Sequence, residues 1–483
     1  MSTPPGLAPG TPRAFGAFGA FGAFGVDGEP GTHGTPGSRG TLTAGAPLPG
    51  LYADLAGQAA KVARPLARGR VTSAVGLSIE VSGLELGIGE AVRIIGDHGP
   101  IMAEVVALGD GYAACLPVSD LRGVRAGNPV LSTGAPLQVP VGPGLLGRVV
   151  NALGQPMDDG PPLRDVVMTS SDGTPPRAMD RERITEPMPL GVRALDTLVP
   201  AGRGQRLGIF AGSGVGKSSL LSMIVRGTEA PISVLALVGE RGREVREFIE
   251  GDLGPEGMKR AVVVVATSDE PSLVRLRAAF TATRIAEWFR DQGQDVILCM
   301  DSVTRVAMAQ REVGLAAGEP PATRGYPPSV FGLMPRLLER AGMAKTGSIT
   351  ALYTVLVDGD DLNDPIADNV RSILDGHIVL SRALATQGHF PAVDVLESIS
   401  RVTKAVTTRE QRADATVMRQ LLAARRDAKD LIDIGAYVKG SNPQVDRALA
   451  QMPEIDAFLR QDMEDLTPAA EAWAELHRIA ESG

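Results

Sequence analysis

Short runs of apolar residues alternate with longer segments of helical periodicity between residues 191 and 401. The short runs predict buried strands, and the longer segments, in which apolar residues recur every three or four positions, predict amphipathic helices. This alternation is typical of a mostly parallel sheet that is covered by helices on both faces. The expected strands are residues 207–210, 233–238, 261–267, 295–300, 348–357 and 377–380, and the best defined helix is 272–291.

A different pattern precedes this region. Between residues 71 and 140, apolar residues alternate with small or polar ones over short distances, as in Val75, Leu77, Ile79 and Val81, and glycines separate the runs. Several short strands with close turns predict a small β-barrel.

The chain after residue 401 has helical periodicity to its end. We expect helices at 408–431, 443–463 and 468–481, the first with Met418, Leu421 and Leu422 on one face. The sequence therefore predicts an α/β protein with a central domain built on a mostly parallel sheet, an N-terminal β-barrel and a C-terminal helical domain. The expected domain boundaries are a disordered tail at 1–48, an N-terminal helix at 49–68, the barrel at 69–140, the central domain at 141–403 and the helical domain at 404–483.

The first 48 residues are of low complexity, and the triplet Ala-Phe-Gly occurs four times between residues 14 and 25. Such a composition buries too little apolar surface to offset the entropy of ordering, so we expect a disordered tail. The Phe-Gly tract is either an interaction element or, more simply, a tail without a role of its own. The basic helix expected at 49–68 either meets a membrane surface or an acidic partner, or exposes its charges to solvent.

Composition argues against some classes of protein. The net charge of −8 over 483 residues argues against a protein whose main work is to hold a nucleic-acid backbone. The two cysteines, Cys115 and Cys299, have no metal-ligand spacing and suggest a reducing compartment. No apolar run reaches the ~18 residues that span a bilayer, and the N-terminus lacks the pattern of a signal peptide, so we expect a cytoplasmic location.

A glycine-rich loop lies between the expected strand 207–210 and a helix, which is the context of a phosphate-binding loop. Its residues are Ala211, Gly212, Ser213, Gly214, Val215, Gly216, Lys217 and Ser218, followed by Ser219. Glycines let backbone N–H groups surround a phosphate, and the helix N-terminus adds partial positive charge. Lys217 is expected to reach the β- and γ-phosphates, and Ser218 to bind Mg²⁺. A turn that binds nothing is the weaker alternative, because Gly-Lys-Ser has no structural use of its own, although alanine at 211 departs from the strict pattern.

Two carboxylates follow expected strands. Asp301 ends an apolar strand and is expected to order the Mg²⁺ shell, and Glu240 follows the strand 233–238 and is our candidate for orienting and deprotonating the attacking water. For residues 239–244, a solvated loop in which arginine and glutamate pair with each other is the alternative.

Four segments in this order resemble the rotary ATPase α/β family: residues 211–218, 239–244, 301–305 and 391–400. Residues 318–331 and 358–368 are similar to the branch that drives protein export, the type III secretion and flagellar export ATPases. The resemblance implies a RecA-like ATP hydrolase that binds ATP, ADP and Mg²⁺ and assembles as a homohexamer with active sites between subunits. Residues 300–312 look more flagellar than virulence-type.

The resemblance also implies roles for further residues. Arg241 and Glu244 would surround the γ-phosphate and metal, Arg305 would lie at the phosphates, and Arg401 would be an arginine finger acting on the neighbouring subunit's nucleotide. ATP synthase catalytic subunits have a tyrosine where this chain has Leu356. Tyr437 is therefore our candidate for an aromatic residue against adenine.

The expected function is ATP hydrolysis that energises protein export through a flagellar type III secretion apparatus, and the alternative is a virulence system. Less favoured alternatives are a catalytic subunit of an ion-translocating synthase, a hexameric nucleic-acid translocase and a subunit that binds nucleotide without hydrolysis. The resemblance implies a stator-like regulator at the N-terminal region, a coiled-coil stalk protein in the pore, export chaperone–substrate complexes and an export gate, at the cytoplasmic face of the inner membrane. No nucleic-acid partner is expected.

Overall fold

The structure is a computed structural model, and it describes residues 68–357 and 364–482 of the chain. The expected low-complexity tail and, apart from Arg68, the expected N-terminal helix lie outside the described residues, as do residues 358–363 of the export-branch segment. Arg68 is the first residue of a strand. Within the described residues, no helix has both the length and the apolar composition needed to cross a membrane.

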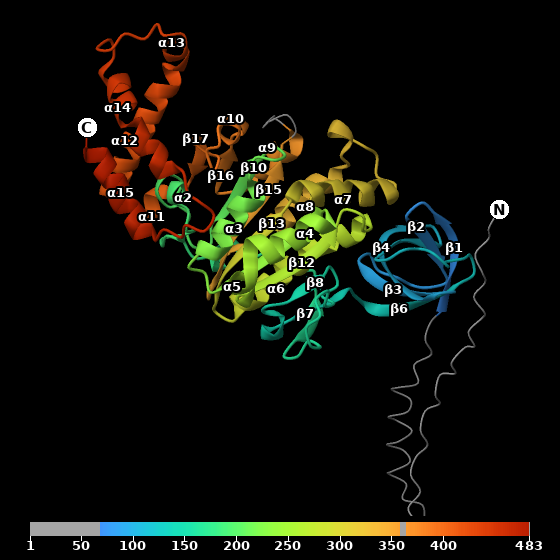
Figure 1. The fold of residues 1–483 in the computed structure, drawn as a ribbon. Coiled ribbons are helices and arrows are strands. Elements are labelled where there is room, and N and C mark those ends of the chain that lie inside the picture. Colours follow the sequence, from blue (N-terminus) through green and yellow to red (C-terminus); the bar gives the residue numbers. More distant parts are fainter. Residues whose placement is uncertain (1–67, 358–363, 483) are drawn as a thin grey trace, which may run out of the picture. The chain divides into compact units, whose positions relative to one another are not determined.

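The N-terminal strands close into a barrel, as the alternating pattern predicts (Figure 1). They are β1 (Arg68–Val75), β2 (Ser78–Ser82), β3 (Glu90–Gly96), β4 (Gly99–Gly109), β5 (Tyr112–Pro117) and β6 (Pro129–Pro136), in the order β1-β2-β5-β4-β3-β6. Alternate residues such as Ile79, Val81 and Ile94 fill the interior completely buried. Val75 and Leu77 interrupt this alternation, because they flank the tight turn at Gly76 and are exposed.

The central sheet contains all six of the expected strands. Its order is β17-β16-β10-β15-β13-β11-β12-β8, and only β17 and the short β14 run antiparallel to their neighbours. The bounds are β8 (Val149–Asn151), β10 (Arg206–Ala211), β11 (Ile232–Glu240), β12 (Ala261–Thr267), β13 (Asp295–Asp301), β14 (Gly342–Met343), β15 (Ser348–Leu356), β16 (Gly376–Leu380) and β17 (Val393–Ser400). A separate two-stranded sheet pairs β7 (Gln138–Val141) with β9 (Val167–Ser170).

Helices cover both faces of this sheet, so the strands are apolar on both sides. Val234, Ala236 and Val238 of β11 belong to one buried cluster, while Leu235 and Leu237 belong to the other. One cluster includes α6 (Ser272–Asp291), α7 (Val303–Ala316), α8 (Pro328–Leu338) and α9 (Pro365–Ile373), and the other includes α2 (Arg193–Leu198) and α3 (Lys217–Gly227). Shorter elements are α4 (Gly242–Glu247), a π-helical turn (Phe248–Leu253), α5 (Gly254–Lys259), α10 (Arg382–Thr386) and 3₁₀ turns at Pro143–Leu145, Ala178–Asp180 and Thr323–Gly325.

The C-terminal part is helical, as expected. It consists of α11 (Thr403–Val406), α12 (Arg409–Asp427), α13 (Lys429–Asp433), α14 (Pro443–Leu459) and α15 (Ala469–Glu481). A capping box between Thr408 and Gln411 starts α12, which buries Met418 and Leu421. The helix expected over 408–431 is interrupted at Ala428, and the helix expected over 443–463 ends at Leu459.

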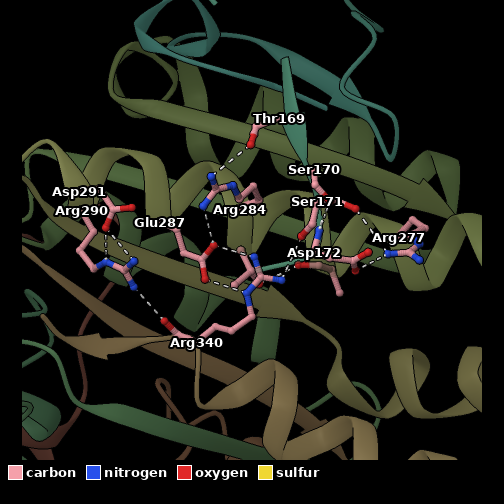
Figure 2. A network of polar contacts seen from close by, with 12 residues as sticks. Thr169, Ser170, Ser171, Asp172, Arg277, Arg284, Glu287, Arg290, Asp291 and Arg340 are labelled. Atoms are coloured by element: carbon pink, nitrogen blue, oxygen red, sulfur yellow. Dashed lines mark hydrogen bonds and ion pairs between the residues drawn. The ribbon is translucent and has the colours of Figure 1, made fainter. Parts of the chain in front are cut away.

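A buried polar network joins α6 to the end of α8 (Figure 2). The guanidinium of Arg340 donates two hydrogen bonds of 2.7 Å to the carboxylate of Glu287, and both side chains are almost completely buried. Arg340 also donates to the carbonyl oxygen of Ser171 at 3.1 Å. Near the other end of α6, Arg277 pairs with Asp172 and with Glu104 of the barrel strand β4. The network therefore ties the barrel, α6 and α8 to one another.

Candidate functional site

The glycine-rich loop lies at the carboxyl end of the parallel strands. It follows β10, which pairs with β15 on one side and β16 on the other, and it leads into α3 at Lys217. Gly214 and Gly216 have φ angles of 77° and 92°, the left-handed region that favours glycine. The backbone therefore turns sharply into the helix N-terminus, where N–H groups without helical partners are available to an anion.

Two carboxylates converge on the lysine of this loop. The Nζ atom of Lys217 lies 2.5 Å from Oδ1 of Asp301 and 3.6 Å from Oε1 of Glu240. β11 and β13 are adjacent, and their register pairs Leu237 with Asp301, so their last residues meet at one edge of the sheet. Thr354 of β15 also donates to Oδ1 of Asp301 at 2.8 Å. The fold therefore brings together Lys217, Glu240 and Asp301, three of the site residues expected from the sequence.

Arg305 is the second cation at Glu240. Its Nε atom lies 3.3 Å from Oε1 of Glu240, and it belongs to the first turn of α7, which Ser302 caps. Gly239 makes this approach possible, because a Cβ atom there would lie 2.5 Å from Cδ of Arg305. The φ of 75° at Gly239 adds a second reason for glycine at this position.

Burial raises the pKa of Glu240 above its usual value, and the nearby Asp301 carboxylate raises it further. Lys217 and Arg305 act in the opposite direction. Oε1 of Glu240 is buried and accepts no hydrogen bond from the described residues, although both cations lie within 3.6 Å of it. Glu240 therefore has an oxygen atom that can accept a hydrogen bond from a group that enters the site.

Arg241 and Glu244 follow Glu240 at the start of α4 and pair with each other, with 3.3 Å between Nη1 and Oε1. Arg241 is 75% exposed, so it is free to turn toward a ligand or a neighbouring chain. Glu244 remains close enough to Glu240 to contribute to the rise in its pKa.

Residues 68–357 and 364–482 hold no cluster of three or more His, Cys, Asp or Glu side chains around a common point. Mg²⁺ that binds together with nucleotide phosphates does not need one, because it retains waters and takes one or two protein oxygens. Ser218 at the start of α3 and Asp301 offer a hydroxyl and a carboxylate at the loop. These donors fit such an ion.

Arg401 lies at the opposite end of the sheet from its own loop. Ser400 pairs with Gly376 at the start of β16, whereas Ala211 at the loop aligns with Leu380 at the end of β16. The six residues of β10 separate the two ends by roughly 20 Å. The exposed guanidinium of Arg401 forms no ion pair with any other described residue.

Two aromatic residues have different relations to the loop. Tyr437 lies between α13 and α14, and its hydroxyl contacts the carbonyl of Asn442 and the carboxylate of Asp446, both at 3.0 Å. Phe390 lies next to the loop, because a Cβ atom on Gly216 would be 3.4 Å from its ring. Phe390 is 45% exposed, and its carbonyl accepts a hydrogen bond from Gln461 just after α14. Sequence reasoning missed Phe390, although it directly precedes the family segment 391–400.

Family models match two parts of the chain. Residues 191–400 match the ATP synthase alpha/beta family, nucleotide-binding domain, and residues 407–478 match the T3SS EscN ATPase C-terminal domain. The first range contains the loop, both carboxylates and Arg305.

Similar proteins extend over most of the chain. It is 53% identical over 411 residues to the flagellum-specific ATP synthase of Bacillus subtilis. The matched region covers 84% of this chain and 94% of the relative. It is 50% identical to the SPI-2 type 3 secretion system ATPase of Salmonella typhimurium, over 79% of this chain and 88% of the relative.

Solved structures agree with this similarity. The assembled ATPase EscN from the enteropathogenic E. coli type III secretion system has a TM-score of 0.81 at 45% identity, over 85% of this chain and 100% of that one. EscN in complex with its central stalk EscO has a TM-score of 0.79 with the same identity and coverage.

Proposed function

Because this chain belongs to the ATP synthase alpha/beta family, in the branch of the flagellum-specific and type III secretion ATPases, we propose that it hydrolyses ATP to energise protein export by a flagellar type III secretion apparatus. The observation that carries this proposal is the convergence of Lys217, Asp301 and Glu240 at the loop. ATP hydrolysis requires these three kinds of group. Lys217 is the cation for phosphate, Asp301 is the carboxylate for a metal, and Glu240 is a partly buried carboxylate with a raised pKa.

The loop and Lys217 hold the triphosphate. Residues 211–219 present backbone N–H groups, and Lys217 exchanges its contact with Asp301 for the β- and γ-phosphates. Ser218 and Asp301 are the residues that would hold Mg²⁺, with Glu244 nearby. When bound, Mg²⁺ supplies positive charge that neutralises the phosphates.

Glu240 orients the attacking water and accepts its proton. Its raised pKa brings it closer to the pH at which a general base is most effective. Arg305, at 3.3 Å, holds this carboxylate in place, and the exposed Arg241 is available to the γ-phosphate.

Arg401 acts on the nucleotide of a neighbouring subunit. Its position at the far end of the sheet keeps it away from the loop of its own chain. Because its guanidinium is exposed and forms no ion pair with the described residues, it is available to a second copy. A head-to-tail ring, which we take to be a homohexamer, brings each Arg401 to the next chain's phosphates.

Phe390 is a second candidate for the adenine contact. It is exposed beside Gly216, and the segment after α14 borders it through Gln461. Tyr437 remains the other candidate, and with its hydroxyl bonded to Asp446 it would contact adenine through the face of its aromatic ring.

The remaining partners are those of an export ATPase. We place the ring at the cytoplasmic face of the inner membrane, with a stalk protein in its pore, a regulator at the N-terminal region, chaperone–substrate complexes and the export gate. The relative EscN is solved with its central stalk EscO, which supports the stalk. A nucleic-acid partner is not part of the proposal.

Glu240→Gln tests the catalytic part of this proposal. The variant keeps the shape of the side chain, so ATP binding should remain at the parental level while turnover falls by roughly 10²–10⁴. Glu250→Gln, in an exposed ion pair with Arg246, is the matched control and should retain turnover. Turnover of Glu240→Gln at the parental rate would remove the assigned base.

A chromosomal Lys217→Ala variant tests the biological part. We expect a strain without flagellar filaments and with normal secretion of virulence proteins. Normal filaments with lost virulence secretion would favour the second candidate, which the similarity to the SPI-2 ATPase supports.

A further inference from the structure

The carbonyl oxygen of Asp375 accepts two hydrogen bonds at the end of the sheet opposite the phosphate loop. One comes from the backbone nitrogen of Arg401 at 3.0 Å, and the other from the side-chain Nε2 of Gln205 at 2.9 Å. The same Nε2 also donates to Oγ of Ser400 at 3.1 Å. One side chain therefore holds the residue before Arg401 and the carbonyl to which Arg401 itself is bonded.

Gln205 is completely buried, and its amide is fully engaged. Oε1 accepts from the backbone nitrogen of Gly202 at 2.9 Å, and both hydrogens of Nε2 have acceptors. An apolar side chain of the same shape would fill this space, but it would leave the backbone nitrogen of Gly202 without its acceptor. The amide also fixes the carbonyl of Asp375 and the hydroxyl of Ser400 relative to the start of β10.

Arg401 depends on this kind of support. Its side chain is exposed and pairs with no described residue, so the position of its backbone alone determines which region the guanidinium can reach. A displacement of about 1 Å can reduce turnover by about 10²-fold when a group must meet a transition state. Asp375 is itself held firmly, because Arg206 donates to its carboxylate from the backbone at 3.2 Å and from Nε at 3.0 Å.

We infer that Gln205 is a positioning residue for Arg401: its amide fixes Asp375 and Ser400 so that the guanidinium meets the nucleotide of the neighbouring subunit. This inference rests on the proposed role of Arg401. Gln205 also directly precedes β10, whose other end is the phosphate loop of the same chain. A substitution at Gln205 therefore acts either on the neighbour's nucleotide through Arg401 or on its own chain's nucleotide through β10.

Rings that contain two kinds of chain separate these two effects. Arg401→Ala removes the arginine from a chain with an intact loop, and Glu240→Gln removes the base from a chain with an intact arginine. The two chains are co-expressed with different tags. In a random equal mixture, about one subunit interface in four then combines an intact Glu240 from one chain with an intact Arg401 from the next. We expect this pair to regain about a quarter of the wild-type turnover. If this pair regains no turnover, the proposed action of Arg401 across the subunit interface is wrong, whatever Gln205 does.

Gln205→Met keeps the size of the side chain and removes the amide. Alone it should lose roughly tenfold to a hundredfold of turnover at unchanged nucleotide affinity. Mixed with Glu240→Gln it should regain about a quarter of wild-type turnover, because that partner supplies an intact arginine. Mixed with Arg401→Ala it should regain none. Three outcomes would each overturn the inference. They are recovery of turnover when Gln205→Met is mixed with Arg401→Ala, no recovery with either partner, and parental turnover of Gln205→Met alone.

Gln451 provides a matched control. It is a buried glutamine of α14 whose Nε2 donates to the carbonyl of Ile479 and to the hydroxyl of Ser482, the same pair of acceptor types. Gln451→Met should lower the unfolding temperature and leave turnover unchanged.

If Gln205→Met does not assemble, Ser400→Ala takes its place. This variant removes one of the two acceptors of the Gln205 amide. Ser400→Ala should show a smaller loss with the same pattern of recovery, and recovery with Arg401→Ala instead would overturn the inference.

Discussion

The ammonium group of Lys217 lies 2.5 Å from a carboxylate oxygen of Asp301. Lys217 is the first residue of α3 and Asp301 is the last residue of β13. Both side chains are largely buried, so solvent screens their attraction only weakly. An incoming triphosphate must therefore compete with Asp301 for the lysine. Each partner has a separate role once the nucleotide is bound, which leads to different expectations for the two substitutions.

Lys217→Ala should abolish nucleotide binding, because it removes the cation for the phosphates and leaves the carboxylates of Glu240 and Asp301 facing them. A fluorescent ATP analogue titrated into the purified protein measures the affinity. Lys259→Ala removes a lysine from an exposed ion pair with Glu256 and serves as the control. Parental affinity in Lys217→Ala would mean that the loop binds phosphate without its lysine.

Asp301→Asn should separate metal from nucleotide. It keeps an oxygen that accepts from Thr354 but removes the charge that competes for Lys217. ATP should therefore bind in EDTA at least as tightly as it binds the wild-type chain, while Mg²⁺-dependent turnover falls by roughly 10²-fold or more. Titrations with and without Mg²⁺ test this, with Asp120→Asn on the barrel as a control. Weaker binding in EDTA would contradict the competition.

Turnover should fall on the acid side with an apparent pKa above 4.5, the usual value for glutamate, because burial raises the pKa of Glu240. As pH falls through this raised pKa, the carboxyl becomes protonated and can no longer accept a proton from water. Arg305 lowers the pKa of Glu240, so Arg305→Ala should move the acid limb to higher pH. A pH profile of kcat/KM measures both. An acid limb that stays in place or moves to lower pH in Arg305→Ala would contradict Glu240 as the titrating group.

Much of the fold could be predicted from local pattern. The strands of the central sheet are apolar on both sides, so they appear as continuous runs such as Val262 to Val265, which periodicity detects. β17 was not expected as a strand, because it alternates apolar residues with Asp394, Glu397 and Ser398 at the edge of the sheet. The interruption of the helix at Ala428 carries no glycine or proline as a signal.

The site was predictable where one strand end or one loop carries the chemistry. Lys217 and Asp301 follow apolar runs, and parallel strands bring such ends together. The position of Arg401 was not predictable from the sequence, because it depends on the register between β16 and β17. Gln205 gave no signal either, since its importance arises only from the two distant segments that its amide joins.

Arg340→Met should destabilise the fold by about 3–5 kcal/mol, because it leaves the carboxylate of Glu287 buried without its main partner. Arg284, 3.3 Å from the same carboxylate, offsets part of this loss. The double variant Arg340→Met/Glu287→Leu should regain most of the stability, since neither charge of this pair remains buried. Urea unfolding measures the midpoints. A double variant less stable than Arg340→Met alone would show that the charges, and not only their pairing, are needed.

Phe390→Ala should weaken ATP binding roughly fivefold to a hundredfold, the range expected when a base loses an aromatic partner. The loss should be specific to the base, because Phe390 lies beside the loop and the phosphate contacts remain. Tripolyphosphate, which has no base, should therefore compete equally well for the variant and the wild-type chain. Tyr437→Ala is the informative counterpart, since its hydroxyl is engaged with Asp446. If Tyr437→Ala weakens ATP but not tripolyphosphate, and Phe390→Ala weakens neither, then the adenine contact is Tyr437 and the ring must bring it to the loop.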